Sequence, residues 1–107
     1  MKQEPGFLRH IMDSLSPLGE IRSRFMFGGW GVFCEGFMFA VFADDSLYFK
    51  VDETNLQMYK KAGSTSFPHG LSYWEVPAEV AEGGKKLLDW AQISMDIAQR
   101  NAQKKKK

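Results

Sequence analysis

Arg24-Phe25-Met26-Phe27-Gly28-Gly29-Trp30-Gly31-Val32-Phe33 continues directly into Cys34-Glu35-Gly36-Phe37-Met38-Phe39-Ala40-Val41-Phe42, and this stretch decides the fold. Phenylalanine recurs through both halves, and glycine interrupts them at positions 28, 29, 31 and 36. Aromatic residues favour strands, whereas glycine favours the turns between strands. The stretch therefore predicts antiparallel strands, joined by turns at Gly28-Gly29 and Glu35-Gly36.

Alternating residues extend this strand pattern in both directions. From Ile21 to Phe27 every second residue is apolar or small, and Arg22, Arg24 and Met26 are expected on an outer face. The predicted strands are Ile21–Phe27, Trp30–Glu35, Phe37–Ala43, Leu47–Val51 and Leu71–Val76.

The third of these strands is apolar on both faces. Simple alternation puts Phe37, Phe39 and Val41 on one face and Met38, Ala40 and Phe42 on the other. Such a strand is either covered on both sides or has one face kept for a partner.

Three helices are predicted around the strands. An apolar stripe predicts a first helix within Glu4–Leu18, and it consists of Leu8, Ile11, Met12 and Leu15. A short second helix would be capped by Asp52 or Thr54 and ended by Gly63, and a final helix would run from about Gly84 to Gln99. The order of elements predicts an α+β fold, in which N- and C-terminal helices cover an antiparallel meander sheet of about five strands.

The composition is typical of one folded domain. The chain has 107 residues, of which 44% are hydrophobic and 25% are charged. A single cysteine, Cys34, cannot form an internal disulfide, and no run of about 18 apolar residues exists that could span a membrane. We therefore expect a cytoplasmic protein, with a single domain over residues 1–103 and no membrane partner.

Lysines are concentrated at the C-terminus. The net charge is +1, and removing the four lysines at 104–107 leaves −3 for the rest of the chain. A slightly acidic domain is unlike a nucleic-acid-binding surface, so no specific nucleic acid is expected. We expect residues 104–107 to be a disordered tail, and the alternative is loose, salt-dependent contact of this tail with phosphates.

Each motif with a catalytic or binding precedent has a simpler structural interpretation. Gly28-Gly29-Trp30-Gly31 leads into a strand, whereas phosphate loops lead into a helix. Cys34 would need His69 as a base, yet apolar surroundings keep a thiol inert. Asp44-Asp45 lacks the spacing of a calcium loop, and one cysteine and two histidines at these separations form no zinc site. We predict no catalytic residue, cofactor or metal site, and hence no enzyme.

Four segments carry a family resemblance. They are Arg24-x-Met26-Phe27-Gly28-Gly29-x-Gly31-x-Phe33, Gly36-x-Met38-Phe39-Ala40, Leu47-Tyr48-Phe49-Lys50-Val51-Asp52, and Phe67-Pro68 with Tyr73-Trp74-Glu75-Val76-Pro77. In these segments, and over roughly residues 5 to 100, the chain resembles the N-terminal domain of the TfoX (Sxy) family of bacterial competence regulators.

The resemblance implies a compact α+β fold similar to that of the type III secretion chaperones. It also implies a link to activation of DNA-uptake genes alongside the cyclic-AMP receptor protein. Full-length members carry a second, C-terminal domain, and this sequence has lysines where that domain would begin, so a single-domain member is expected. No helix-turn-helix is visible, so we expect a protein partner such as a transcription factor rather than direct reading of DNA.

Aromatic and cationic residues of the sheet are the candidate binding surface. The candidate partner-binding residues are Arg24, Phe27, Gly28, Gly29, Trp30, Phe33, Tyr48 and Lys50. Exposed residues of these types form protein-interaction hot spots or stack the bases of a single strand, whereas buried ones simply pack under helices. An exposed edge strand also predicts a homodimer.

Two functional hypotheses follow. The first is a non-enzymatic TfoX-like protein-interaction module that regulates competence or transcription through protein partners. The alternative is a small-molecule-binding or enzymatic domain with a pocket between sheet and helices. A catalytic pocket needs convergent titratable groups, and those of this sequence are scattered, which favours the first hypothesis.

Overall fold

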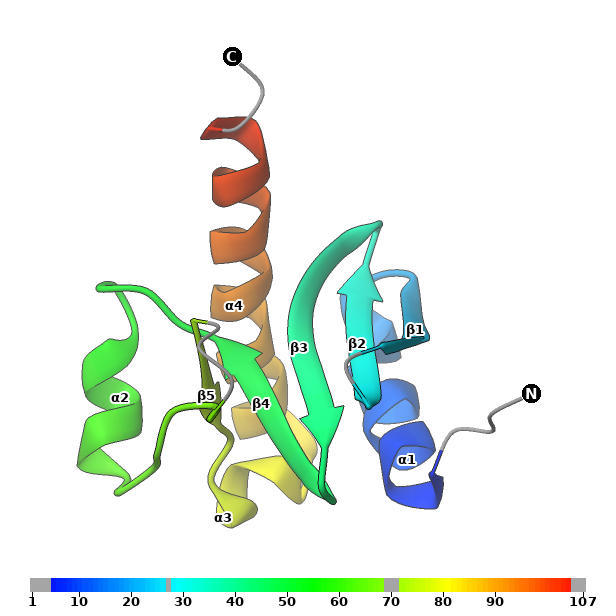
Figure 1. Ribbon diagram of the computed structural model, residues 1–107, viewed down its shortest axis with the longest axis horizontal. Helices are drawn as coiled ribbons and strands as arrows, with labels where there is room; N and C mark the ends of the chain where they lie inside the picture. The colour runs from blue at the N-terminus through cyan, green and yellow to red at the C-terminus, as the bar shows by residue number, and fades with distance from the viewer. Residues whose placement is uncertain (1–4, 27, 69–71, 105–107) are drawn as a thin grey trace.

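The computed structural model describes residues 5–26, 28–68 and 72–104, which form an antiparallel sheet with helices before and after it (Figure 1). The strands are β1 (Ile21–Met26), β2 (Gly29–Cys34), β3 (Phe37–Ala43), β4 (Ser46–Lys50) and β5 (Tyr73–Glu75). Their order in the sheet is β1-β2-β3-β4-β5, so each strand pairs with the next one along the chain. This is the predicted five-stranded meander.

Helical segments flank the sheet. They are α1 (Gly6–Leu15), the 3-10 turn η1 (Ser16–Leu18), α2 (Leu56–Lys61), α3 (Ala78–Ala81) and α4 (Gly84–Lys104). The α+β class is confirmed, and the short α3 was not predicted. None of the described helices is both long and apolar enough to cross a membrane.

Tight turns of residues with left-handed backbone conformation join the strands of two hairpins, β2–β3 and β3–β4. Glu35 and Gly36 have φ angles of 51° and 88°, and Asp44 and Asp45 have φ angles of 52° and 61°. Two consecutive residues with positive φ form the turn whose twist matches that of antiparallel strands. The predicted turn at Glu35-Gly36 is therefore confirmed, and Asp44-Asp45 forms a turn of the same kind between β3 and β4.

An extra residue in β3 makes the predicted faces of this strand wrong. Val32 pairs with Ala40, but the next residue, Phe33, pairs with Met38, so Phe39 has no partner in β2. Such a bulge reverses the alternation of side chains along the strand. The helix-side core takes Phe37, Phe39, Ala40 and Phe42, whereas Met38 and Val41 belong to the other side.

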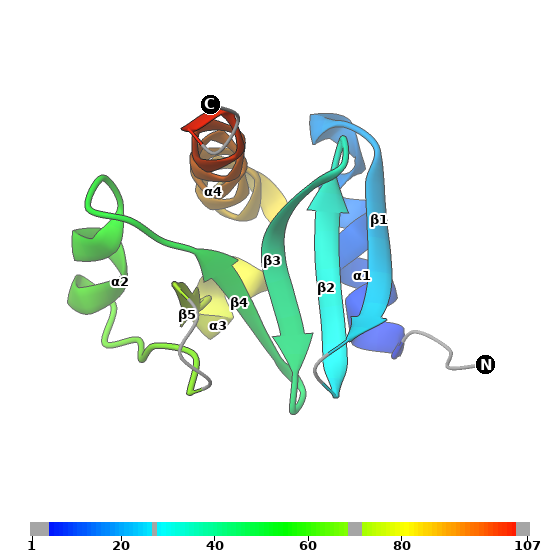
Figure 2. The same ribbon diagram turned by 45° about the horizontal axis from the view of Figure 1, so that its top comes forward.

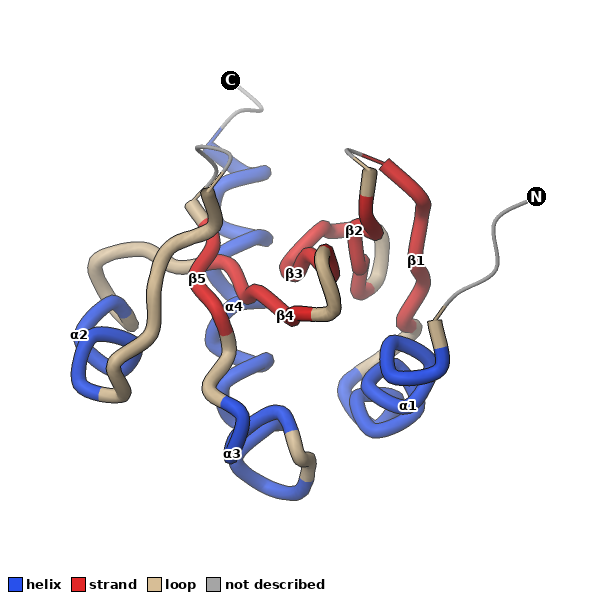
Figure 3. The backbone as a smooth tube through the Cα atoms, turned by 60° about the horizontal axis from the view of Figure 1, so that its bottom comes forward, coloured by secondary structure: helices blue, strands red, loops and turns tan. Residues whose placement is uncertain are grey.

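The main core lies between the sheet and helices α1 and α4, both of which lie behind the sheet in Figure 1. All four residues of the predicted α1 stripe are buried in it. Helix α4 adds Leu87, Ala91, Met95 and Ala98. Figure 3 shows α1 and α3 below the sheet.

The opposite face of the sheet is covered over part of its width. Val41, Phe67 and Tyr73 form a second buried cluster, and the ring of Tyr48 lies 4.8 Å from that of Phe67. The segment around Phe67 is hydrogen-bonded to β5, because Phe67 N–H donates to the Tyr73 carbonyl oxygen at 2.7 Å. This segment covers the side of β3 to β5, whereas no described helix lies in front of β1 and β2 in Figure 2.

The start of α2 differs from the predicted cap. Asn55 occupies the N-cap position, and neither Asp52 nor Thr54 caps the helix. Asp52 instead organises the preceding turn, because its Oδ1 accepts a hydrogen bond from Thr54 N–H at 2.8 Å. Its own N–H donates to Asn55 Oδ1 at 2.9 Å. The predicted end of the helix is confirmed by Gly63, which has a φ of 78°.

A buried polar network joins the end of β4 to α2 and α4. The carbonyl oxygen of Lys50 accepts hydrogen bonds from Ser94 Oγ at 2.7 Å and from Asn55 Nδ2 at 3.3 Å. Both donors are almost fully buried. The hydroxyl of Tyr59 is also buried, which raises its pKa, and it makes no hydrogen bond with the described residues.

This contrast predicts opposite effects of two small substitutions. Ser94→Ala should lower the free energy of unfolding by about 1 kcal/mol, because it removes a buried hydrogen bond. Tyr59→Phe should leave that free energy unchanged or raise it, because the lost hydroxyl has no partner. Urea denaturation of both variants measures the difference, and a larger loss for Tyr59→Phe would contradict the network.

Candidate functional site

Five side chains lie together on the open side of the sheet, over β1 and β2 and at the adjoining edge of the covered part of β3, and we call them the Arg–Met face. They are Arg22, Arg24, Met26, Phe33 and Met38. The strand register brings them together, because Arg22 lies opposite Phe33 and Phe33 lies opposite Met38. Arg24 lies opposite Gly31, which adds no side chain of its own.

The backbone at Gly31 is the centre of the Arg–Met face. A Cβ atom at this position would lie 2.9 Å from Met26 Sδ, 3.0 Å from Met38 Sδ and 3.4 Å from Phe33 Cε1. The three side chains therefore converge over the β2 backbone, and the missing side chain of Gly31 is what lets them do so. They form an apolar floor that is half-buried.

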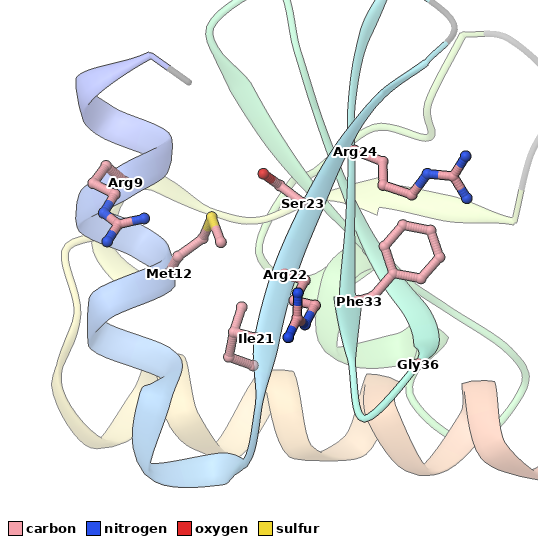
Figure 4. A pocket seen from close by; sticks show the side chains of 8 residues that line it. All are labelled: Arg9, Met12, Ile21, Arg22, Ser23, Arg24, Phe33 and Gly36. Atoms are coloured by element: carbon pink, nitrogen blue, oxygen red, sulfur yellow. The ribbon is translucent and has the colours of Figure 1, made fainter. Parts of the chain in front are cut away.

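A groove of about 620 Å³ runs along β1 beside this floor (Figure 4). Its lining residues are Arg9, Met12, Ile21, Arg22, Ser23, Arg24, Phe33 and Gly36. In Figure 4 the side chains of Arg24 and Phe33 lie on one side of β1, and those of Arg9 and Met12 come from α1 on the other side. The groove therefore extends around edge strand β1, with Arg24 lining it on one side of the strand and Arg9 on the other.

The two arginines of the Arg–Met face differ in their surroundings. The Arg22 guanidinium lies 2.7 Å from Glu20 Oε2, and this hydrogen bond lowers the pKa of Glu20 and raises that of Arg22. Both side chains are largely exposed, so solvent screens the pair. Arg24 is exposed and makes no hydrogen bond or ion pair with any described residue. Of these two arginines, Arg24 is therefore the one whose charge no described carboxylate pairs with.

The structure brings only part of the predicted candidate surface together. Arg24 and Phe33 meet on the Arg–Met face. Trp30 lies on the opposite side, where it packs on the main core and stacks edge-on against Phe25 with ring centroids 5.4 Å apart. Tyr48 is beneath Phe67, and Lys50 Nζ lies 5.0 Å from the ring centroid of Tyr73.

The other candidates are structural or lie outside the description. Gly28 is exposed in the turn between β1 and β2, with a φ of 73°. Gly29 is buried, and a Cβ there would lie 2.7 Å from the carbonyl oxygen of Phe42. Phe27 lies outside the described residues, so its predicted role stays a prediction.

The predicted list of partner-binding residues leaves out three members of the Arg–Met face, although two of them, Arg22 and Met26, were expected on the outer face of the first strand. Arg22 and Met26 carry the same alternation as Arg24, and that signal was available. Regular alternation grouped Met38 with Ala40 and Phe42 on one face, whereas Ala40 and Phe42 belong to the core and Met38 lies on the other side of the sheet. Without knowledge of the bulge, no pattern separates these three residues.

The residues of the rejected catalytic and metal motifs are partly described by the structure. Cys34 is 2% exposed, and burial, followed by the charge of Glu35, raises the pKa of its thiol. His10 is exposed on α1, and His69 lies outside the described residues. Within the described part of the chain, no three His, Cys, Asp or Glu residues are grouped as metal ligands.

The thiol environment predicts slow alkylation. Iodoacetamide should modify Cys34 in the folded protein at least about tenfold more slowly than in denaturant, because both burial and a raised pKa reduce accessible thiolate. Mass spectrometry of samples taken over time at mildly alkaline pH measures both rates. Equal rates would show that Cys34 is exposed in solution.

A second groove of about 300 Å³ lies beside the last turns of α4. Phe37, Met38, Lys50 and Tyr73 line it from the sheet, and Ala98 and Asn101 are among the residues that line it from α4. Gly36 and Met38 connect it with the surface around the first groove, since Gly36 lines both grooves and Met38 belongs to the Arg–Met face.

Comparison with known proteins agrees with the sequence pattern. No curated protein matches the chain. The family described as the TfoX N-terminal domain matches residues 13–98 of the 107, a range that contains the whole sheet and the Arg–Met face. The chain therefore belongs to the TfoX N-terminal domain family.

Proposed function

We propose that this protein is a non-enzymatic interaction module that regulates transcription, in particular of DNA-uptake genes, by binding a protein partner in the cytoplasm. Membership of the TfoX N-terminal domain family supports the regulatory part of the proposal. The observation that carries the interaction part is the Arg–Met face, which combines a half-buried apolar floor with an exposed arginine.

The chemistry of this face suits recognition of another protein. Arginine and aromatic residues are enriched at interaction hot spots, and methionine adapts its shape to different partners. Arg24 supplies a charge that no described residue neutralises, and Met26, Phe33 and Met38 supply apolar area beside it. These groups hold a partner by contact area and charge, without any step of bond chemistry.

Deletion of the gene in the source organism tests the regulatory role. Transcripts of DNA-uptake genes, measured by quantitative PCR, should fall in the deletion strain and recover when the wild-type chain is supplied. Arg24→Glu should fail to restore them, whereas Lys61→Glu, an equal charge reversal at an exposed residue of α2, should restore them. Unchanged transcripts in the deletion strain would contradict the proposal.

A further inference from the structure

We propose that the Arg–Met face binds an acidic segment of its partner, which places carboxylates beside Arg24 and Arg22 and a large apolar side chain on the floor around Gly31. This inference rests on the proposed function, because it names the chemistry of the partner that the module would bind. The occupant is thus an acidic–apolar stretch of another protein.

The part-covered sheet shows what kind of occupant this face takes. On the side of β3 to β5, the chain's own segment supplies Phe67, which packs with Val41 and Tyr73 in a buried cluster. Over β1 and β2, the same side of the sheet shows an apolar floor with no such cover from the described residues. An apolar side chain from a partner would cover this floor in the same way as Phe67 covers Val41 and Tyr73.

Charge decides which apolar partner fits. Arg24 is exposed and has no counter-charge among the described residues, and Arg22 forms an exposed ion pair with Glu20. A planar guanidinium binds a carboxylate through two parallel hydrogen bonds, which adds geometry as well as charge. A partner segment with Asp or Glu next to its apolar residue therefore satisfies both parts of the face.

The same charges disfavour a second copy of the chain. In a two-fold symmetric contact the same patch meets itself, so Arg22 and Arg24 of both copies would lie together. Antiparallel pairing of two β1 strands about such an axis would also put all four guanidinium groups on one face of the joined sheet. Like charges placed side by side in an interface are costly.

A single nucleic-acid strand fits this face less well than a peptide. Base stacking needs successive aromatic platforms, and Phe33 is the one aromatic ring among the five residues of the face. The remaining floor is made of methionine side chains, which pack on irregular apolar shapes. The acidic Glu20 at Arg22 also interrupts the cationic track that a phosphate backbone would follow.

Selection from a library of random dodecapeptides, displayed on phage against the full chain, tests the proposal directly. Enriched peptides should carry Asp or Glu beside Leu, Ile, Phe or Trp. The affinity of one such synthetic peptide, measured by fluorescence anisotropy, should fall at least about tenfold in Arg24→Glu and less in Arg24→Gln, because a carboxylate loses its partner in both but is repelled only in the first.

Controls separate this result from general effects. Lys61→Glu makes the same change of net charge on α2 and should leave the affinity unchanged. Thermal unfolding should show that both charge-reversal variants remain folded, since both residues are exposed. Equal weakening by Arg24→Glu and Lys61→Glu, or enrichment of peptides without acidic residues, would overturn the proposal.

An oligonucleotide arm separates the two classes of macromolecule. A fluorescent single-stranded oligonucleotide should bind weakly and without dependence on Arg24, and tight Arg24-dependent binding would overturn the peptide assignment. The two proposals also fail differently. Lost peptide binding with intact transcript regulation would leave a regulator that uses another surface, whereas intact peptide binding without regulation would reject the transcriptional role.

Discussion

Phe39→Ala should lower the free energy of unfolding by about 3–5 kcal/mol, the range for removing a large aromatic side chain from a core. Phe39 is completely buried, and its ring lies 5.8 Å from that of Phe49 on the neighbouring strand. Its bulge position directs it to the helix side, so truncation leaves a cavity under α4. Urea denaturation of wild type and variant gives the difference.

Phe25→Ala is the matched control for this prediction. The Phe25 side chain is 46% exposed and packs edge-on against Trp30. Its loss should therefore cost no more than about 1.5 kcal/mol, the upper value for an aromatic pair. If Phe39→Ala costs less than about 1 kcal/mol, the ring is not in the core and the position of the bulge is wrong.

Gly29→Ala should be the second most damaging of the substitutions considered, with a loss of about 1–3 kcal/mol. The added Cβ would lie 2.7 Å from the Phe42 carbonyl oxygen and 2.9 Å from Ala43 Cβ. The first of these is a backbone atom, which cannot rotate away as the end of a long side chain can. The β2 and β3 strands would have to separate locally, and the same denaturation experiment measures the cost.

Gly6→Ala is the control for the general effect of replacing glycine. No atom lies within 4 Å of a Cβ built at Gly6, which begins α1. Alanine favours helix more than glycine does, so the free energy of unfolding should stay the same or rise by up to about 1 kcal/mol. Similar losses in both variants would mean that the close approach at Gly29 does not decide the effect.

The fold could be predicted because its determinants are local in the sequence. The α1 stripe repeats every three to four residues, and the turns at Glu35-Gly36 and Asp44-Asp45 need residues that tolerate positive φ. A meander pairs each strand with its neighbour along the chain, so the order of strands follows from the turns alone. Long-range information was not needed for these features.

The faces of β3 could not be predicted, because the bulge depends on how two strands fit together. Nothing in Phe37–Ala43 distinguishes Phe39 from the other apolar residues around it. The predicted α2 cap was wrong for a related reason. The carboxylate of Asp52 accepts a hydrogen bond from Thr54 N–H within the preceding turn, and its own N–H donates to the Asn55 side chain, so Asp52 does not cap the helix. Both errors involve choices between equally suitable residues.

The candidate site was predicted in part. Arg24 and Phe33 were selected for their type, and the register places them together. Trp30 was selected for the same reason, yet it is one residue from Gly31 on β2 and so points to the opposite side. Residue type indicates which side chains can bind a partner, but only their alternation along each strand indicates which of them lie on the same side of the sheet.

The bulge at Phe39 decides which residues of β3 face the core and which face the open side of the sheet. With the same residues but no bulge, regular alternation back from Phe42 would put Met38 on the core side and Phe37 on the open side, although no letter of the sequence had changed. Deletion of Phe39 is therefore expected to remove the bulge and to keep Met38 and Phe37 on their present sides, because their pairs with Phe33 and Cys34 then follow the pair Val32–Ala40 in regular register. When family members are aligned, the number of residues between Gly31 and Asp44 thus carries information about binding that residue identities alone do not.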